Sequence, residues 1–343
     1  LKVALSTLNT GRLTLPAACL GLAKRCLEIV RQWSNERVQW GTPIGQHAAI
    51  ADKLARMAAN TFALEAMTLL TASRVDRDKH ADIRLEAAMC KLWGTETAWE
   101  IVNDAMQIRG GRGYETADSL KARGEDPVAM ERFLRDCRIN TIFEGSSEIM
   151  RLFIAREALD PHLKVVGAVL HSQFPVGQRL QAALKAGWFY ARWYPKLFWP
   201  LSPIKNQKSK FHPTLAKQVR YASRMSRRLA RSLFHAMVRF GPKLERQQLL
   251  LGRFVDIGTE LFAITATCSR AQGLLADKNE KEGEDMLGLA DYFCRSAQLR
   301  VEKYFQGIGH NADRAGYRLA QRVLAGNYEW LEQGVVKPAP DPN

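Results

Sequence analysis

The sequence predicts an all-α protein, in which a four-helix up-and-down bundle is followed by a second helical domain. Apolar residues recur at helical spacing along most of the chain, and no run alternates apolar and polar residues as a half-buried strand would. Of the 343 residues, 46% are hydrophobic and 25% are charged, a balance typical of a folded globular chain. No stretch reaches the roughly 20 uninterrupted apolar residues of a membrane-spanning helix.

The predicted bundle occupies residues 1–160. Its long helices have apolar residues at every third or fourth position and are separated by turns that contain glycine and proline. We expect these helices over residues 13–35, 46–75 and 82–108, and from residue 146 onward. Long helices joined by short turns favour antiparallel neighbours, and hence an up-and-down bundle.

The composition changes at Asp160-Pro161. Residues 161–244 contain 16 Lys and Arg but no Asp or Glu, so this segment carries the whole basic excess of a chain whose formal net charge is +15. We expect a basic, aromatic linker or insertion over 161–213, an additional helical domain over 214–334 and a disordered tail over 335–343. Within the additional domain, helical spacing predicts elements over 214–240, 244–275, 284–306 and 312–331.

Aromatic residues are concentrated in the linker, where they make up seven of the twelve residues 188–199. Trp and Tyr favour the interface of a bilayer, and each nearby Lys or Arg adds about 1 kcal/mol of attraction to anionic lipid. We therefore expect residues 187–231 to contact an anionic membrane surface peripherally. Packing of the aromatics between the two domains is the main alternative, and nucleic-acid binding is the least favoured.

The six cysteines are scattered and include no CxxC pair and no His/Cys pair at metal-ligand spacing. Cysteines with apolar neighbours are typical of small core residues in a reducing compartment. The sequence therefore predicts no metal site.

Two segments of the bundle are suited to a phosphate-bearing ligand. Three glycines within Gly110 to Gly113 at a helix end allow positive φ and close approach of a phosphate or a second backbone. Arg37 lies near Trp40 at a tight turn, and the arginine fork donates two parallel hydrogen bonds to a pyrophosphate. A plain turn and a surface arginine are the local alternatives.

A third segment, Ile142 to Ile149, places Glu144 between two apolar residues and Gly145, directly before a helix. A carboxylate in such a setting is suited to act as a general base. The alternative is equally good on local chemistry alone: a serine caps the helix and Glu144 is merely solvated.

In this order, the segments resemble the acyl-CoA dehydrogenase family over residues 1 to about 160. The motifs that carry the resemblance are Thr10-Gly11-Arg12, Glu36-Arg37-x-x-Trp40-Gly41, Gln107-x-x-Gly110-Gly111-x-Gly113-Tyr114, Leu134-Arg135-Asp136 and Glu144-Gly145. The region after about Thr214 resembles the extra helical domain of very-long-chain members.

The resemblance implies FAD-dependent α,β-dehydrogenation of long-chain acyl-CoA thioesters to trans-2-enoyl-CoA in fatty-acid β-oxidation. Glu144 matches the catalytic base that removes the α-proton, and Arg12 matches the arginine beside it. Substrate contacts are implied for Asn9, Gly11, Arg12 and Gly145. FAD contacts are implied for Arg37, Trp40, Gln107, Gly110, Gly111, Ser146 and Glu148, those of Arg37 and Trp40 across a dimer interface.

The resemblance also implies an electron-transfer flavoprotein as electron acceptor and assembly into a homodimer or tetramer. The implied location is the bacterial cytoplasm or the mitochondrial matrix, peripheral to the inner membrane.

The sequence departs from the family at several positions. Gly11 stands where some members carry the base, which leaves Glu144 as the only candidate, and Glu148 replaces a common Gln. About ten extra residues lie between Tyr114 and Phe133. The family's N-terminal helical domain and β-domain are not in the chain, so we expect a C-terminal portion that is inactive alone. The alternative is a non-catalytic helical scaffold for dimerisation and for docking to a membrane or partner.

Overall fold

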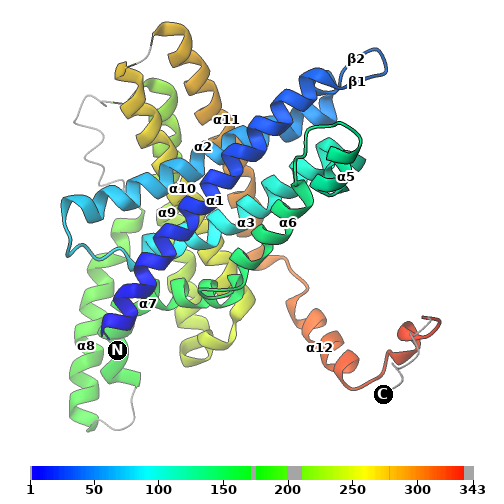
Figure 1. Cartoon of the computed structure of the whole chain (residues 1–343). Helices are drawn as coiled ribbons and strands as arrows, with labels where there is room; N and C mark the ends of the chain where they lie inside the picture. The colour runs from blue at the N-terminus through cyan, green and yellow to red at the C-terminus, as the bar shows by residue number, and fades with distance from the viewer. Residues whose placement is uncertain (1, 171–174, 199–210, 278, 336–343) are drawn as a thin grey trace.

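The computed structural model describes residues 2–170, 175–198, 211–277 and 279–335, and it is almost entirely helical (Figure 1). The all-α prediction is confirmed. Trp199 and most of the predicted tail lie outside the described residues. Among the described helices, none is long and apolar enough to cross a membrane.

Long helices make up most of the chain. They are α1 (Lys2–Glu36), α2 (Ala48–Arg77), α3 (Arg84–Arg109), α7 (Ser147–Leu170), α8 (Val176–Trp193), α9 (Pro213–Phe240), α10 (Gln248–Leu274) and α11 (Glu280–Gly309). The shorter helices are α4 (Gly111–Tyr114), α5 (Ala117–Ala122), α6 (Met130–Arg138) and α12 (Asp313–Leu324). Single 3₁₀ turns connect them: η1 (Ile44–Gln46), η2 (Ile139–Thr141), η3 (Pro195–Leu197), η5 (Gly241–Arg246), η6 (Leu275–Asp277) and η7 (Glu329–Glu332).

A two-stranded hairpin joins α1 to α2. Strands β1 (Val38–Gln39) and β2 (Thr42–Pro43) pair antiparallel around Trp40 and Gly41. Both turn residues have positive φ, +49° and +82°, which is the geometry of a type I′ turn. Glycine adopts this geometry without strain, but a bulky tryptophan rarely does.

The first bundle and the later helices share one core. Helix α1 packs along α2 and α3, and α10 packs against α9 and α11 of the later helices and against α2 and α7. At the junction the Trp93 ring meets the Phe293 ring edge-to-face, with centroids 5.9 Å apart. In contrast, α12 extends away from both bundles (Figure 1), and none of its residues is buried.

Helix α7 runs through Pro161, where the composition of the sequence changes. A proline inside a helix removes one backbone hydrogen bond and usually kinks or ends the helix. Here α7 packs against α3, α8 and α10, and this packing on several sides offsets the loss. Segment 161–213 therefore begins inside a helix and also contains α8.

Candidate functional site

Glu144 lies in a left-handed turn between η2 and α7. Its φ is +57°, and that of Gly145 is +98°. Trp40 and Glu144 are the only non-glycine residues with positive φ in the described part of the chain. Such strained residues cluster at functional sites. A Cβ on Gly145 would lie 2.9 Å from the Met150 sulfur, so both its backbone angle and its packing require glycine.

The Glu144 side chain projects toward α1. A Cβ built on Gly11 would lie 3.1 Å from both carboxylate oxygens, so a carboxylate attached at residue 11 would reach the same space. One of these oxygens, Oε2, is buried and accepts no hydrogen bond from the protein. A carboxylate oxygen that accepts no hydrogen bond from the protein is available to accept a proton.

Arg12 approaches the same carboxylate from α1. Its guanidinium carbon lies 4.3 Å from the centre of the Phe153 ring, and its buried Nε–H has no hydrogen-bond acceptor. Burial lowers the pKa of Arg12, and the charges of Glu144 and Glu157 oppose that shift. The structure thus brings the predicted pair Arg12 and Glu144 together.

The other residues predicted around the base are placed less completely. Asn9 lies on α1, but its side chain is outside the described residues. Ser146 directly precedes α7, where its hydroxyl is 3.5 Å from the Ile149 N–H. Glu148 is exposed, and its pKa is lowered by hydrogen bonds from its own N–H and from Ser146.

Lys91 is a site residue that the sequence analysis missed. Its side chain on α3 is fully buried, and Nζ donates a 2.6 Å hydrogen bond to the Gly145 carbonyl. The signal was a lone lysine within the apolar run Ala87 to Trp93. Its partner, however, is 54 residues away in sequence.

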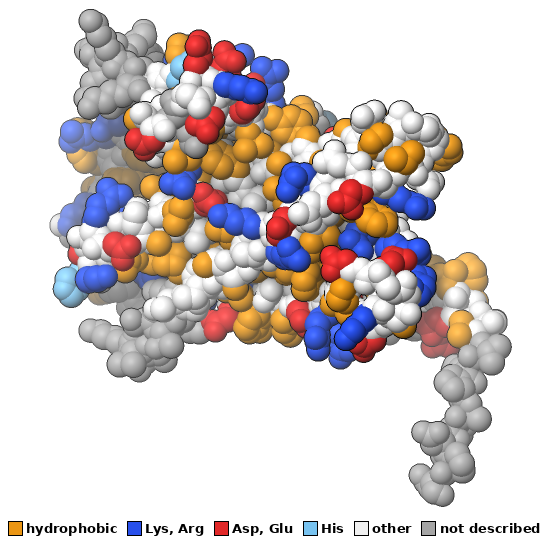
Figure 2. All heavy atoms as spheres, turned by 45° about the horizontal axis from the view of Figure 1, so that its top comes forward, with side chains coloured by type: hydrophobic (Ala, Val, Ile, Leu, Met, Phe, Trp, Pro, Cys, Tyr) orange, Lys and Arg blue, Asp and Glu red, His pale blue; other side chains and the backbone are white. Residues whose placement is uncertain are grey.

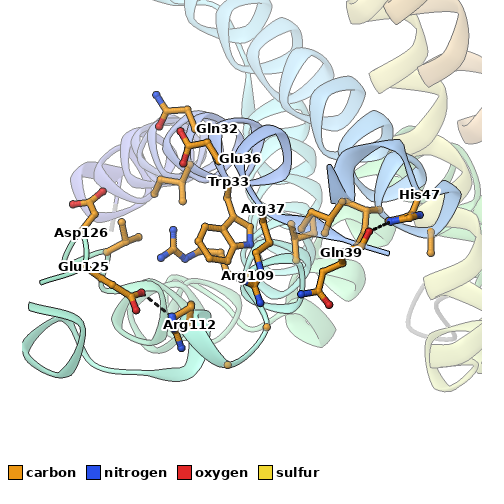
Figure 3. A pocket seen from close by; sticks show the side chains of 18 of the residues that line it. Gln32, Trp33, Glu36, Arg37, Gln39, His47, Arg109, Arg112, Glu125 and Asp126 are labelled. Carbon is orange, nitrogen blue, oxygen red and sulfur yellow. Dashed lines mark hydrogen bonds and ion pairs between the residues drawn. The ribbon is translucent and has the colours of Figure 1, made fainter. Parts of the chain in front are cut away.

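A large pocket lies at the opposite end of the bundle, between the C-terminal part of α1 and the α3–α4 corner (Figure 3). Its volume is about 1000 Å³. The predicted residues Arg37, Trp40, Gly110 and Gly111 all line it, whereas the exposed Gln107 does not. A Cβ on either glycine would meet nothing within 4 Å, so their backbones are open to a ligand.

Further basic and aromatic residues in this pocket were not predicted. The Arg109 guanidinium carbon lies 4.8 Å from the Trp33 ring centre (Figure 3), and its buried Nε–H has no acceptor. Burial lowers the Arg109 pKa, against the charges of Asp126 and Glu125. The inserted loop also reaches the pocket, since Glu125 pairs with Arg112 at 2.7 Å. Arginine forks beside open glycines suit a phosphate-bearing ligand.

The two groups of predicted residues do not meet within one chain. Arg12 and Glu36 lie on one continuous helix, so the rise of 1.5 Å per residue separates them by ~36 Å. Glu144 and Arg12 are at one end of the bundle, and the pocket is at the other. Within the described ranges, no group of three or more His, Cys, Asp or Glu is arranged to hold a metal ion.

The predicted aromatic segment divides into two sets. Tyr190, Trp193 and Tyr194 pack against Phe234 of α9, with ring centroids 5.0, 6.1 and 5.0 Å away. Trp188 instead is 68% exposed. Packing therefore accounts for Tyr190, Trp193 and Tyr194, whereas Trp188 is available for an external contact.

Two family models match separate parts of the chain. The one described as acyl-CoA dehydrogenase, C-terminal domain, matches residues 1–159, and the one described as ACAD9/ACADV, C-terminal domain, matches residues 213–326. The probable acyl-CoA dehydrogenase FadE10 of Mycobacterium tuberculosis is 49% identical over 336 residues, which are 98% of this chain and 51% of the relative. The human mitochondrial very long-chain specific acyl-CoA dehydrogenase is 28% identical over 313 residues, covering 88% of this chain and 44% of the relative.

A solved structure shares the fold. An acyl-CoA dehydrogenase from Bacillus anthracis, complexed with FAD, aligns with a TM-score of 0.65 at 24% identity, covering 98% of this chain and 54% of that one. The chain spans about half the length of the curated relatives it matches. The order of the motifs and these matches agree, and the chain belongs to the acyl-CoA dehydrogenase family, to whose C-terminal domain its first 159 residues correspond.

Proposed function

We propose that this chain supplies the catalytic base and part of the flavin site of an enzyme that dehydrogenates long-chain acyl-CoA thioesters between Cα and Cβ. The observation that carries the proposal is the Glu144 carboxylate, which lies over Gly11 beside Arg12 with a buried oxygen that accepts no hydrogen bond. A purely structural carboxylate at such a site would be paired, because an unpaired buried acceptor costs about 1–3 kcal/mol.

Glu144 removes the proton from Cα of the thioester, which is acidic because the adjacent carbonyl stabilises the resulting negative charge. The electron pair of that C–H bond forms the double bond as hydrogen leaves Cβ with its own pair. FAD, when bound, accepts this hydride. Arg12 attracts the Glu144 carboxylate, and the left-handed turn carries that carboxylate toward Gly11 of α1.

The cofactor would be held at the other end of the bundle. Arg37 and Arg109 would donate to the pyrophosphate, Gly110 and Gly111 would let it approach the backbone, and the exposed ring of Trp40 would stack on the adenine. Because this pocket is ~36 Å from Arg12 along α1, a complete site would combine the base of one copy with the pocket of another. This geometry supports a homodimer or a larger homo-oligomer.

Three further assignments complete the proposal, two of which rest on the relatives. The very long-chain specific relatives support a preference for long acyl chains, and the reduced flavin requires an acceptor, for which we propose an electron-transfer flavoprotein. The relatives of this chain include bacterial and mitochondrial proteins, in keeping with a bacterial cytoplasm or a mitochondrial matrix.

The test uses this chain expressed together with the region of its relatives that it does not cover, which we refer to as the completed enzyme. Glu144→Gln should slow exchange of the acyl-CoA α-proton with D₂O by roughly 10²- to 10⁴-fold while flavin absorbance is retained. Glu28→Gln, an exposed acid on α1, is the control and should exchange normally. Full exchange in Glu144→Gln would refute the base, and flavin binding without any exchange in the unmodified enzyme would favour the scaffold.

We also propose that α8 contacts an anionic membrane surface. Leu180, Leu184 and Trp188 follow one another at intervals of four residues and are 63%, 68% and 68% exposed, so they form one apolar stripe on a helix. Arg192 continues the stripe, with its guanidinium carbon 5.6 Å from the Trp188 ring centre. An apolar stripe flanked by arginine and lysine is typical of helices that lie in a lipid interface.

Flotation with vesicles rich in phosphatidylserine tests the contact. Leu184→Ala/Trp188→Ala should reduce the bound fraction several-fold, because each buried side chain contributes about 1.5–3 kcal/mol. Leu299→Ala/Trp330→Ala, which also removes exposed apolar side chains, is the matched control and should bind normally. Unchanged binding of the α8 variant would contradict the proposal.

A further inference from the structure

Lys91 carries a charged ammonium group but is fully buried without a carboxylate partner in the described part of the chain. Its side chain has no exposed surface, and no carboxylate lies within ion-pair distance of Nζ among the described residues. Burial of an ammonium group costs several kcal/mol unless hydrogen bonds compensate. The compensating bond runs to a single backbone atom, the carbonyl of Gly145, at 2.6 Å.

That carbonyl belongs to the turn that carries the base. Glu144 and Gly145 are consecutive left-handed residues, and the non-glycine member costs about 1–2 kcal/mol in this conformation. Backbone hydrogen bonds secure the flanks, from Phe143 N–H to Ile139 and from Met150 N–H to Ser146. The hydrogen bond from Lys91 of α3 to the Gly145 carbonyl secures the centre of the turn.

The same geometry sets the direction of the Glu144 side chain. Rotation of the Gly145–Ser146 peptide, which Lys91 holds, would alter the turn and thereby the angle at which the Glu144 carboxylate approaches Gly11. Arg12 and Lys91 both act electrostatically on Glu144 but form no ion pair with it in the described structure. The carboxylate is therefore directed through its backbone.

We propose that Lys91 is a positioning residue for the base: its ammonium group holds the Gly145–Ser146 peptide, and with it the turn at Glu144, so that the carboxylate projects over Gly11. As a role in catalysis, this rests on the proposed function. The effect of Lys91 on the structure of the turn is independent of the proposed function. The structural effect and the catalytic effect can therefore be tested separately.

The first experiment measures hydrogen exchange by mass spectrometry on the 343-residue chain. Lys91→Met should raise amide exchange over residues 142–149 by roughly 10-fold, which corresponds to the loss of one charged hydrogen bond, and should leave the hairpin at 38–43 unchanged. Lys53→Met is the matched control, because Lys53 pairs with Asp104 between α2 and α3 of the same bundle. Equal exchange over 142–149 in the two variants would overturn the proposal. If Lys91→Met fails to fold, Lys91→Gln, which is shorter and uncharged, replaces it with the same expected rise in exchange.

The second experiment measures steady-state kinetics of the completed enzyme. Lys91→Met should lower kcat by about 10- to 100-fold through misplacement of the base, with a small change in KM, and Lys91→Arg should recover part of kcat. If Glu144→Gln is inactive while Lys91→Met is fully active, this inference fails and the proposed function stands. If Glu144→Gln is fully active, the proposed function fails, and hydrogen exchange alone decides what Lys91 holds.

Discussion

Gly11 leaves open the space above α1 into which the Glu144 carboxylate projects. A methyl group at this position would lie 3.1 Å from the carboxylate oxygens, closer than an ordinary contact, so the carboxylate would shift by a few tenths of an ångström. We expect Gly11→Ala to lower kcat of the completed enzyme by roughly 10-fold, because base catalysis depends steeply on alignment. Stopped-flow reduction of the flavin by an acyl-CoA measures the effect.

Gly21 provides the matched control on the same helix. A Cβ at this exposed position meets nothing within 4 Å, so Gly21→Ala should raise the free energy of unfolding by about 0.5–1 kcal/mol and leave kcat unchanged. Equal kcat values for the two alanine variants would contradict the proposed contact at Gly11.

At the scale of elements, Arg151 joins α7 to two other helices. It donates to both Glu96 oxygens on α3, at 2.8 and 2.9 Å, and to Asp256 on α10 at 2.8 Å. Burial lowers the pKa of Arg151, but these bonds outweigh burial and raise it. Burial raises the pKa of Asp256 to about 6, against the opposing effect of Arg151.

This shift predicts a pH dependence of stability with a definite sign. The folded chain binds the Asp256 proton more tightly than the unfolded chain, whose pKa is near 3.8. The resulting stability is fully present below about pH 4 and is lost as the pH rises through about 6, by at most about 3 kcal/mol. Asp256→Asn should therefore gain stability relative to the unmodified chain between pH 4 and 6. Urea unfolding at several pH values measures the difference.

Asp313→Asn makes the same chemical change at a residue whose pKa is shifted in the opposite direction. Arg253 lowers the pKa of Asp313 through two hydrogen bonds, so its contribution is lost only as the pH falls below about 4. Between pH 4.5 and 6.5 this variant should differ from the unmodified chain by a constant. A constant difference for Asp256→Asn as well would rule out the predicted titration.

At the scale of the whole molecule, the separation of base and pocket makes a prediction about subunits. Glu144→Gln and Arg37→Glu should each inactivate the homo-oligomer of the completed enzyme. The two variants are then mixed and reassembled. Some sites will combine Glu144 of an Arg37→Glu chain with Arg37 of a Glu144→Gln chain, and activity should return at those sites. If every site used both residues of one chain, each site would keep one lesion and the mixture would stay inactive.

The surface of the chain fits incorporation into a larger assembly. Hydrophobic side chains gather over the middle of the face shown in Figure 2. Around Glu144, the side chains of Ile142, Phe143 and Ile149 are 50%, 43% and 57% exposed. Apolar areas of this kind mark interaction sites. The apolar setting expected for Glu144 is therefore only partly built by this chain.

Local sequence signals predicted α2, α3 and α9 to α11, but they missed α5, α6 and α8 and placed the start of α1 at residue 13 instead of residue 2. They also singled out Glu144, Trp40 and Gly110, all of which have positive φ. These features are encoded by helical spacing and by residues with special backbone angles. The Lys91 contact and the stacking of Arg109 on Trp33 depend on which helices become neighbours, which local spacing does not contain. For the same reason, sequence could not tell that Trp193 packs inward and Trp188 points outward.

The continuity of α7 has a mechanical consequence. Its first residue follows the base turn by two positions, and its last lies just before the helix that carries the apolar stripe. At 1.5 Å per residue, the 24 residues form a lever ~36 Å long. If α7 tilted by about 5° about its α8 end, the end next to the Glu144 turn would move by about 3 Å over this length. Any such tilt would be shared with α3 and α10, because α7 packs against both of these helices.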